Sequence, residues 1–352
     1  GPPMGPDDFA YDLPDDQIAQ VPLDGRSSAR LLVDLADGND PDHRHVSDLP
    51  DLVGPGDVLV LNETRVLPAR LRLTKDTGGA VEVLLLEQTG DEGEWEALAR
   101  PSRRVPPGTR LRAGDDLTVT VGDDLGEGRR TVMLETDPPE GPAGVLAAVQ
   151  AHGEMPLPPY LHTRLDDPER YQTVYSQRPA SAAAPTAGLH LTGGVLDACR
   201  EAGAAVERLE LVVGLDTFRP VTADDLDDHV MHSESYTVAE STLDACRAAE
   251  RVIAVGTTTV RALESANLAA SGEGGTAGRT DLFIRPGFDF GVVDVVLTNY
   301  HLPRSTLLVM LEAFVGPRWR GLYTLALAEG YRFLSFGDAM LVGRQGPDRI
   351  TP

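Results

Sequence analysis

The stretch that decides the fold is Val252-Ile253-Ala254-Val255-Gly256-Thr257-Thr258-Thr259-Val260-Arg261. Its first four residues are apolar and rich in β-branched side chains, which is typical of a short buried strand. Gly256 ends that strand, and the threonines after it are suited to begin a helix. A buried strand followed at once by a helix predicts an α/β domain.

The same alternation of strands and helices covers the rest of the chain after Glu154. We expect strands at 206–213, 282–284 and 292–297. We expect helices from Thr192 to about Gly203, from a capping box at Ser241 and Asp244 through Arg251, and from Ser305 or Thr306 to Gly316. Nearer the start of the chain, residues 58–61 are typical of another buried strand, because they follow a turn signal at 54–57.

A different pattern separates these two regions. Between Leu71 and Gly153, short alternating strands recur, each bounded by Gly, Pro or Asp, and helical periodicity is absent. This spacing is typical of a small β-barrel or sandwich. We therefore predict a large α/β domain interrupted by an inserted all-β, barrel-like domain. The expected bounds are 9–70 and 154–343 for the α/β domain and 71–153 for the insertion, with tails at 1–8 and 344–352.

The charge of the chain excludes several functions. Its 352 residues include 31 basic and 55 acidic side chains, which gives a formal net charge of −24. Such acidity argues against a protein that coats nucleic acid without selectivity, although it permits a local arginine-lined cleft for one RNA loop. The single lysine, Lys75, lies in a polar turn, so lysine-based catalysis is not expected. No run approaches the roughly 18–20 apolar residues that cross a bilayer, so we expect a soluble, cytoplasmic protein.

Polar stretches punctuated by glycine follow the predicted buried strands, where α/β proteins bind ligands. The turn at 256–258 offers backbone N–H groups and hydroxyls that suit a carboxylate or another anionic group. The alternative interpretation of this turn is a simple helix cap. Four of the eight histidines lie in such stretches and are candidates for proton transfer near neutral pH, namely His190, His229, His232 and His301.

Metal chemistry has one candidate cluster. His229, His232 and Glu234 are residue types that bind zinc, but no further spaced histidine or cysteine completes a ligand set. The same side chains also suit proton transfer or hydrogen bonding. We therefore expect no metal site, and we expect Cys199 and Cys246 to be inert buried residues.

Several long motifs lie in order along the chain. They are Tyr11 to Pro14, Ile18 to Gln20, Leu61 to Arg70, Tyr171 to Tyr175, Ala183 to His190, Gly214 to Val221, Met231 to Glu234, Val260 to Ser265, Leu297 to Pro303 and Gly337 to Met340. From about residue 9 to 343, this set resembles the S-adenosylmethionine:tRNA ribosyltransferase-isomerase family of queuosine biosynthesis. Collinear motifs of this length are far more specific than any single glycine pattern.

The resemblance implies that S-adenosylmethionine is a co-substrate. In this family its ribosyl moiety is transferred to the aminomethyl group of 7-aminomethyl-7-deazaguanine in a tRNA anticodon loop and is isomerised. The products are epoxyqueuosine-tRNA, adenine and methionine. The resemblance also implies an α/β domain with an inserted β-barrel, tRNA as the partner, and no metal or second cofactor. We expect no membrane association and a monomer.

The chemistry of that reaction guides the choice of site residues. The C5′ hydrogens beside a sulfonium are acidic, and adenine gains a proton as it leaves, so proton-transfer groups are needed. We expect catalytic roles for His190, His232 and Glu234. We expect the co-substrate to be bound by Thr186, Gly188, Thr217, Phe218, Gly256, Thr257, Thr258 and Arg261, and the RNA substrate by Asn62, Arg65, Asn299, His301 and Arg304.

The chain departs from the family pattern at 212–218, where Val212-Val213-Gly214-Leu215-Asp216-Thr217-Phe218 stands in place of His-Val-Gly-x-Gly-Thr-Phe. An aliphatic side chain cannot carry the proton that a histidine carries, and Asp216 adds negative charge. Two alternatives therefore stay open. One is a paralogue that uses S-adenosylmethionine on a small acceptor or cleaves it without tRNA, and the other is a non-catalytic binding protein.

Overall fold

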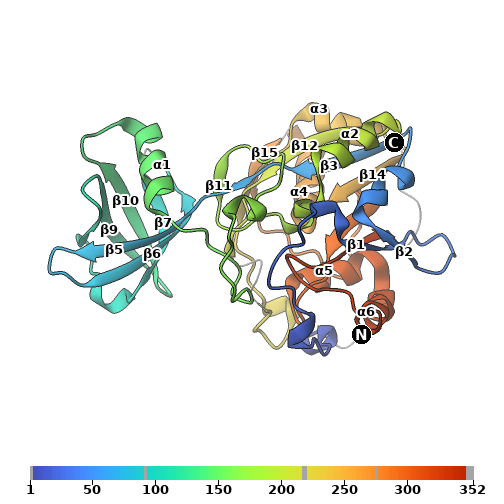
Figure 1. Ribbon diagram of the computed structural model, residues 1–352, viewed down its shortest axis with the longest axis horizontal. Helices are drawn as coiled ribbons and strands as arrows, with labels where there is room; N and C mark the ends of the chain where they lie inside the picture. The colour runs from blue at the N-terminus through green and yellow to red at the C-terminus, as the bar shows by residue number, and fades with distance from the viewer. Residues whose placement is uncertain (1–2, 91–92, 216–219, 274–275, 346–352) are drawn as a thin grey trace. The chain divides into compact units, whose positions relative to one another are not determined.

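The computed structural model describes residues 3–90, 93–215, 220–273 and 276–345 (Figure 1). The chain divides into two compact units. The first contains Gly1–Thr64, Pro159–Gln177 and Pro185–Pro352, and the second contains Arg65–Pro158 and Arg178–Ala184. The second unit thus interrupts the first in sequence, and it extends beyond the 71–153 expected for the insertion.

A nine-stranded mixed sheet forms the centre of the first unit, in the order β15-β13-β12-β3-β14-β16-β17-β1-β2 (Figure 1). Neighbours are parallel from β12 through β3 and β14 to β16, whereas β17 runs antiparallel to β16 and parallel to β1. β2, β13 and β15 are antiparallel additions. The strand bounds are Arg30–Asp34 (β1), Asp42–His45 (β2), Asp57–Asn62 (β3), Ala205–Leu211 (β12), Glu234–Thr237 (β13), Arg251–Val255 (β14), Ala277–Thr280 (β15), Val295–Asn299 (β16) and Ala339–Gly343 (β17).

The central strands are buried on both faces, as their continuous apolar sequences predict. In β14, Ile253 and Val255 share a core with Leu196 of α2, while Val252 and Ala254 point to the opposite face and are also buried. The helices of this unit are α2 (Gly193–Glu201), α3 (Glu240–Ala248), α4 (Thr257–Glu273), α5 (Thr306–Val315) and α6 (Trp319–Ala328). In the part of the chain that the structure describes, no helix has the length and hydropathy of a membrane span.

The helix starts test the capping predictions. Thr192 caps α2 and Ser305 caps α5 through their side-chain oxygens, as predicted. The capping box at Ser241 is wrong, because the N-cap of α3 is Ala239, two residues earlier, and Asp244 pairs instead with Arg247 (Oδ1 to Nη1, 3.4 Å). The predicted last residue of that helix, Arg251, is already the first residue of β14.

The predicted strand at 282–284 is also wrong. The Leu282 N–H donates to Thr280 Oγ1 (3.1 Å), and the Leu282 carbonyl accepts from Arg261 Nε (3.2 Å). Side chains thus occupy backbone groups that a strand would pair. The strand at this end of the sheet is β15, which pairs with β13.

The second unit contains a closed antiparallel barrel, in the order β10-β7-β6-β5-β8-β9, which confirms the inserted barrel-like domain. Alternate residues of each strand point inwards, so that Val81, Val83 and Leu85 of β6 lie in one core with Trp95. The strand bounds are Arg70–Lys75 (β5), Ala80–Gln88 (β6), Glu94–Arg100 (β7), Arg110–Ala113 (β8), Leu117–Gly126 (β9) and Arg129–Thr136 (β10).

The expectation that this region contains no helix is wrong, because α1 spans Gly141–His152. Ala148 and Val149 lie in the barrel core, and Val145 and Leu146 pack against it. The apolar residues of α1 form one continuous run, so the spacing that indicates an amphipathic helix is missing from the sequence.

Two short parallel strands join the segments at which the chain enters and returns to the second unit. They are β4 (Arg65–Val66) and β11 (Pro179–Ser181). The Arg65 N–H donates to the Arg178 carbonyl at 3.1 Å. Residues 178–184 therefore belong to the barrel unit although they lie after it in sequence.

A buried carboxylate on α4 fixes the loop before β16. Glu264 is 1% exposed and accepts three backbone N–H groups, from Gly291 (2.9 Å), Val292 (3.0 Å) and Val293 (3.1 Å). Removal of this side chain would leave three donors without a partner in the protein interior.

We predict that Glu264→Ala lowers the free energy of unfolding by about 3–5 kcal/mol, because each orphaned buried donor costs about 1–3 kcal/mol. Urea unfolding followed by circular dichroism measures this loss. Glu264→Gln keeps one acceptor oxygen, so its free energy of unfolding should fall by less than that of Glu264→Ala. Glu201→Ala, at an exposed position of α2, is the control. An unchanged free energy for Glu264→Ala would contradict the role of this carboxylate.

Candidate active site

The polar stretches that the sequence singles out meet at one edge of the nine-stranded sheet. β3 ends at Asn62, β14 runs into Gly256 and β16 ends at Asn299, and these parallel strands end on the same side. β13 is antiparallel to β12 and β17 to β16, so Glu234 and Asp338 at their starts come to this edge as well. The carboxyl edge of the parallel strands is where open α/β sheets bind ligands.

Gly256 turns the chain from β14 into α4. Its φ of +94° lies in the left-handed region, which glycine adopts without strain. Its N–H donates to the Leu297 carbonyl of β16 (2.8 Å). Ala187 lies close to it, since a Cβ at position 256 would be 3.6 Å from the Ala187 Cβ. The turn η7 (Thr186–His190) therefore packs directly on the start of α4.

Asn62 ties the start of α4 to the neighbouring strands. Its Nδ2 donates to Thr258 Oγ1 (3.0 Å) and to the Leu211 carbonyl (3.1 Å). Its Oδ1 accepts from the N–H groups of Leu211 (3.1 Å) and Thr64 (3.2 Å). The amide has two donors and two acceptor positions, and all four are used. Asn62 thus positions Thr258 and has no free group for a ligand.

His190, Asn299 and Thr186 form a hydrogen-bonded chain. Asn299 Nδ2 donates to Thr186 Oγ1 (2.9 Å), which leaves Oδ1 to accept from His190 Nε2 (2.7 Å). His190 is 5% exposed, and burial lowers its pKa below the usual value, so the ring is neutral at pH 7. Because Nε2 carries the hydrogen in this arrangement, Nδ1 is the basic atom of the ring.

A small pocket beside His190 is lined by two arginines, Arg26 and Arg170. Backbone carbonyls hold both guanidinium groups. Burial lowers the pKa of both, and the positive charge of Arg26 lowers that of Arg170 further. An anionic or acceptor-rich group is favoured here, whereas a cationic group such as a sulfonium is repelled.

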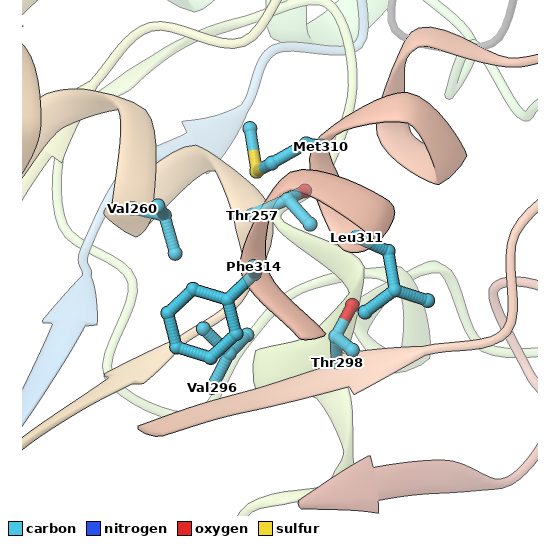
Figure 2. A pocket seen from close by; sticks show the side chains of 7 residues that line it. All are labelled: Thr257, Val260, Val296, Thr298, Met310, Leu311 and Phe314. Carbon is cyan, nitrogen blue, oxygen red and sulfur yellow. The ribbon is translucent and has the colours of Figure 1, made fainter. Parts of the chain in front are cut away.

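A second small pocket is apolar (Figure 2). Figure 2 shows that its walls come from α4, α5 and β16. Thr257, in the first turn of α4, connects this pocket to the turn at Gly256. Two hydroxyls are the only polar groups among its side chains, so the pocket suits an uncharged part of a ligand. The lining residues are Thr257, Val260, Val296, Thr298, Met310, Leu311 and Phe314.

Gly188 shapes the η7 turn by its lack of a side chain. A Cβ at this position would lie 2.1 Å from the hydroxyl oxygen of Tyr175 and 3.0 Å from Thr173 Cγ2. Tyr175 is buried in the core of the sheet. The close approach of Tyr175 therefore requires glycine, and it holds the turn that carries His190.

Glu234 and Arg261 form a buried ion pair between Arg261 Nη1 and Glu234 Oε1, with side chains 7% and 12% exposed for Arg261 and Glu234. The other oxygen, Glu234 Oε2, accepts from the Gly214 N–H (2.6 Å). Arg261 Nε donates to the Leu282 carbonyl. Arg261 Nη2 is buried and has no hydrogen-bond partner among the described residues. Glu234 thus fixes Arg261 and the start of the 214–220 loop at once.

The remaining predicted site residues lie in several environments. His232 is exposed, two residues before β13. Arg304 is exposed, and its Nη2 pairs with Asp7 Oδ1 at 3.1 Å. Arg65 is half-buried and belongs to the barrel unit. Thr217 and Phe218 lie outside the described residues.

His301 is buried beside the end of β16. Its Nε2 lies 2.9 Å from Thr298 Oγ1, and its N–H donates to the Tyr323 hydroxyl (2.8 Å). Tyr11 donates its hydroxyl hydrogen to the His301 carbonyl. Burial lowers the pKa of His301 to about 3, so this ring stays neutral across the physiological range.

Three residues of this edge were missed by the sequence analysis. Arg26 and Arg170 fall in no recognisable motif, and only the fold brings them to His190. Asp338 lies in a motif, and its two oxygens accept the N–H groups of Arg30 and Arg332, both at 2.7 Å. Among the described residues, no group of three or more His, Cys, Asp or Glu side chains has the arrangement of a metal site.

Comparison with known proteins agrees with these observations. Residues 6–342 match the family described as "Queuosine biosynthesis protein". The chain belongs to this family. The S-adenosylmethionine:tRNA ribosyltransferase-isomerase of Rubrobacter xylanophilus is 49% identical over 96% of this chain and 98% of its own length. The enzyme of the same name from Moorella thermoacetica is 48% identical over 96% of this chain and 99% of its own.

A solved structure supports the same assignment. The S-adenosylmethionine tRNA ribosyltransferase of Thermotoga maritima is 33% identical, with a TM-score of 0.53, over 95% of this chain and 99% of that one. Membership of the queuosine biosynthesis family, predicted from the motifs, is thus confirmed.

We predict that His301 contributes to loss of stability in acid. Below pH 6.5 the unfolded chain binds a proton at this histidine, whereas the folded chain does not until about pH 3. The free energy of unfolding should therefore fall by about 3 kcal/mol between pH 6.5 and 4 through this group. Urea unfolding at pH 7 and pH 4 measures the effect, and His301→Gln should show a smaller fall than the wild type. His162→Gln, at an exposed position, is the control. An equal fall in His301→Gln would contradict the prediction.

Proposed function

We propose that this chain is an S-adenosylmethionine:tRNA ribosyltransferase-isomerase that acts on tRNA in the cytoplasm. It would transfer the ribosyl moiety of S-adenosylmethionine to 7-aminomethyl-7-deazaguanine in the anticodon loop and release adenine and methionine. The observation that carries this proposal is the family match over nearly the whole chain. The gathering of the matching motifs at one sheet edge supports it.

His190 is our candidate for removal of a proton from the substrate. Its ring is neutral, and Asn299 and Thr186 fix its orientation. Nδ1 is then available as a base, and a base works best when its orientation is fixed before the reaction. His232, which is exposed, lacks the burial that makes His190 attractive for this role.

Glu234 acts as a positioning residue in this proposal. Both of its oxygens are already engaged, by Arg261 and by the Gly214 N–H, so it does not serve as a proton carrier or as a counter-ion for the sulfonium. Arg261 keeps one terminal nitrogen for a ligand. We assign that nitrogen to the methionine carboxylate of the co-substrate, because a guanidinium binds a carboxylate through a charge-assisted hydrogen bond.

The two pockets separate charged from uncharged groups. The positive charges of Arg26 and Arg170 disfavour the sulfonium and favour an acceptor-rich ring or an anionic group. The apolar pocket at Thr257 suits an uncharged part of the co-substrate. We therefore propose that the sulfonium lies outside the arginine-lined pocket, on the side from which its C5′ hydrogen reaches His190.

The test of this function is adenine release that depends on the modified RNA. The protein is mixed with S-adenosylmethionine and an anticodon stem-loop that carries either 7-aminomethyl-7-deazaguanine or guanine. We expect adenine and methionine in equal amounts with the modified RNA alone, and a matching increase in RNA mass. Adenine formed without RNA, at a rate that RNA does not change, would contradict the tRNA function and indicate a cofactor-cleaving paralogue.

We predict that His190→Ala lowers the rate of adenine release at least about 100-fold, because general base catalysis is typically worth 10²–10⁴-fold. Chromatographic assay of adenine measures the rate, and calorimetry checks that S-adenosylmethionine is still bound. His162→Ala removes an exposed histidine and should retain the wild-type rate. Near-normal turnover of His190→Ala would remove His190 from the mechanism.

A further inference from the structure

The barrel unit carries a concentrated positive surface in an acidic chain. Between Glu96 and Asp115 there are five arginines and no acidic residue, although the whole chain has a net charge of −24. All five arginines are exposed. We call this set the arginine rim, and its members are Arg100, Arg103, Arg104, Arg110 and Arg112.

The backbone beneath the arginine rim is held in place by the barrel core. Val105, Leu111 and Ala113 are buried in that core. On β8, Leu111 and Ala113 point inwards and alternate with Arg110 and Arg112, so both arginines face outwards. The rim therefore presents its charges from a structured scaffold, which lowers the entropy cost of binding a ligand.

The members of the rim lie on neighbouring elements. Lys75 at the end of β5 donates from Nζ to the carbonyl of Arg104 in η5 (Ser102–Arg104). β5 in turn pairs with β8, with Thr74 opposite Arg112 and Lys75 opposite Leu111. η5, the end of β5 and β8 thus adjoin, and they carry four of the five arginines of the rim.

The charge of the rim is only partly compensated, since Arg100 lies opposite Glu82 in the pairing of β7 with β6. Among the described residues, its one ion pair joins Arg112 Nε to Asp76 Oδ1 at 3.7 Å. Three arginines of the other unit, at 44, 200 and 247, each pair with an aspartate two or three residues away. Neighbouring like charges with few counter-ions are unfavourable alone and favour a partner with repeated negative charges.

We propose that the arginine rim binds the phosphate backbone of the tRNA substrate, an inference that rests on the proposed function. Five guanidinium groups exceed what one small anion requires and suit a ligand with several phosphates. The acidity of the rest of the chain repels RNA, so it directs the backbone to this surface. Contacts of this kind set the position of the RNA and carry no sequence information.

The experiment compares two variants with the same change in charge. Arg103→Gln/Arg104→Gln/Arg110→Gln neutralises the rim, and Arg44→Gln/Arg200→Gln/Arg247→Gln neutralises three paired arginines of the other unit. Fluorescence anisotropy measures the affinity of each for full-length tRNA, with and without 7-aminomethyl-7-deazaguanine, over a range of salt concentrations. Thermal unfolding and calorimetric binding of S-adenosylmethionine check that each variant is folded and loads its co-substrate.

We expect the rim variant to bind both tRNAs about tenfold or more weakly, and the slope of log K against log salt to fall by about 2–3 for three lost phosphate contacts. The KM for tRNA should rise while kcat and co-substrate binding stay unchanged. The control variant should keep the wild-type affinity and slope.

Three outcomes separate this inference from the proposed function. Equal affinities and salt slopes for the two variants overturn the proposal that the arginine rim binds tRNA. The proposal is also overturned if the wild type binds no tRNA but binds phosphatidylserine vesicles and the rim variant does not, because the rim would then bind a membrane surface. A wild type that binds tRNA through the rim but releases no adenine overturns the proposed function and leaves the rim as an RNA-binding surface.

Discussion

The parallel register of β3, β12, β14 and β16 is the constraint on which the candidate site depends. These strands end together because each is hydrogen-bonded to its neighbour in the same direction. The amide of Asn62 then locks the common edge, since it bonds across β3 and β12 and holds the first turn of α4. Disturbance of this register would separate residues that no local contact otherwise brings together.

Buried polar contacts at this edge of the sheet fix the positions of side chains more than they add to stability. The pair of Glu234 and Arg261 is taken out of water, so its net contribution to stability is small compared with the cost of breaking it. What the pair provides is a fixed position for one guanidinium and for the Gly214 backbone. Asn299 does the same for His190. The site is thus built from side chains that orient other side chains, with few groups left over for a ligand.

The sequence was most informative where one local signal decides the structure. Buried strands such as 252–255, helix caps such as Thr192, and the alternating strands of the barrel were predicted from their own residues, and the fold class is confirmed. The motifs identified the family, which the match over residues 6–342 confirms. Helix α1 was missed because its apolar residues are contiguous, and the strand at 282–284 failed because side chains took its backbone partners.

Site geometry was less accessible to sequence reasoning. Asn62 and Glu234 were chosen for their chemistry, but only the fold reveals that their polar atoms are already engaged by the protein. Arg26 and Arg170 approach His190 from segments about 150 residues apart along the chain. No local sequence pattern can therefore predict the pocket that they line.

The pairing of β1 with β17 has a consequence for the folding of the chain during translation. Leu31 and Ala339 are partners although about 300 residues separate them, so one edge of β1 stays unpaired until almost the whole chain is translated, while the other edge can pair early with β2. The barrel, whose strands follow one another closely, is complete long before then and can fold as soon as it emerges. The nascent chain would therefore pass through a stage with a finished barrel attached to an unfinished sheet, whose exposed apolar strands are natural clients for chaperones.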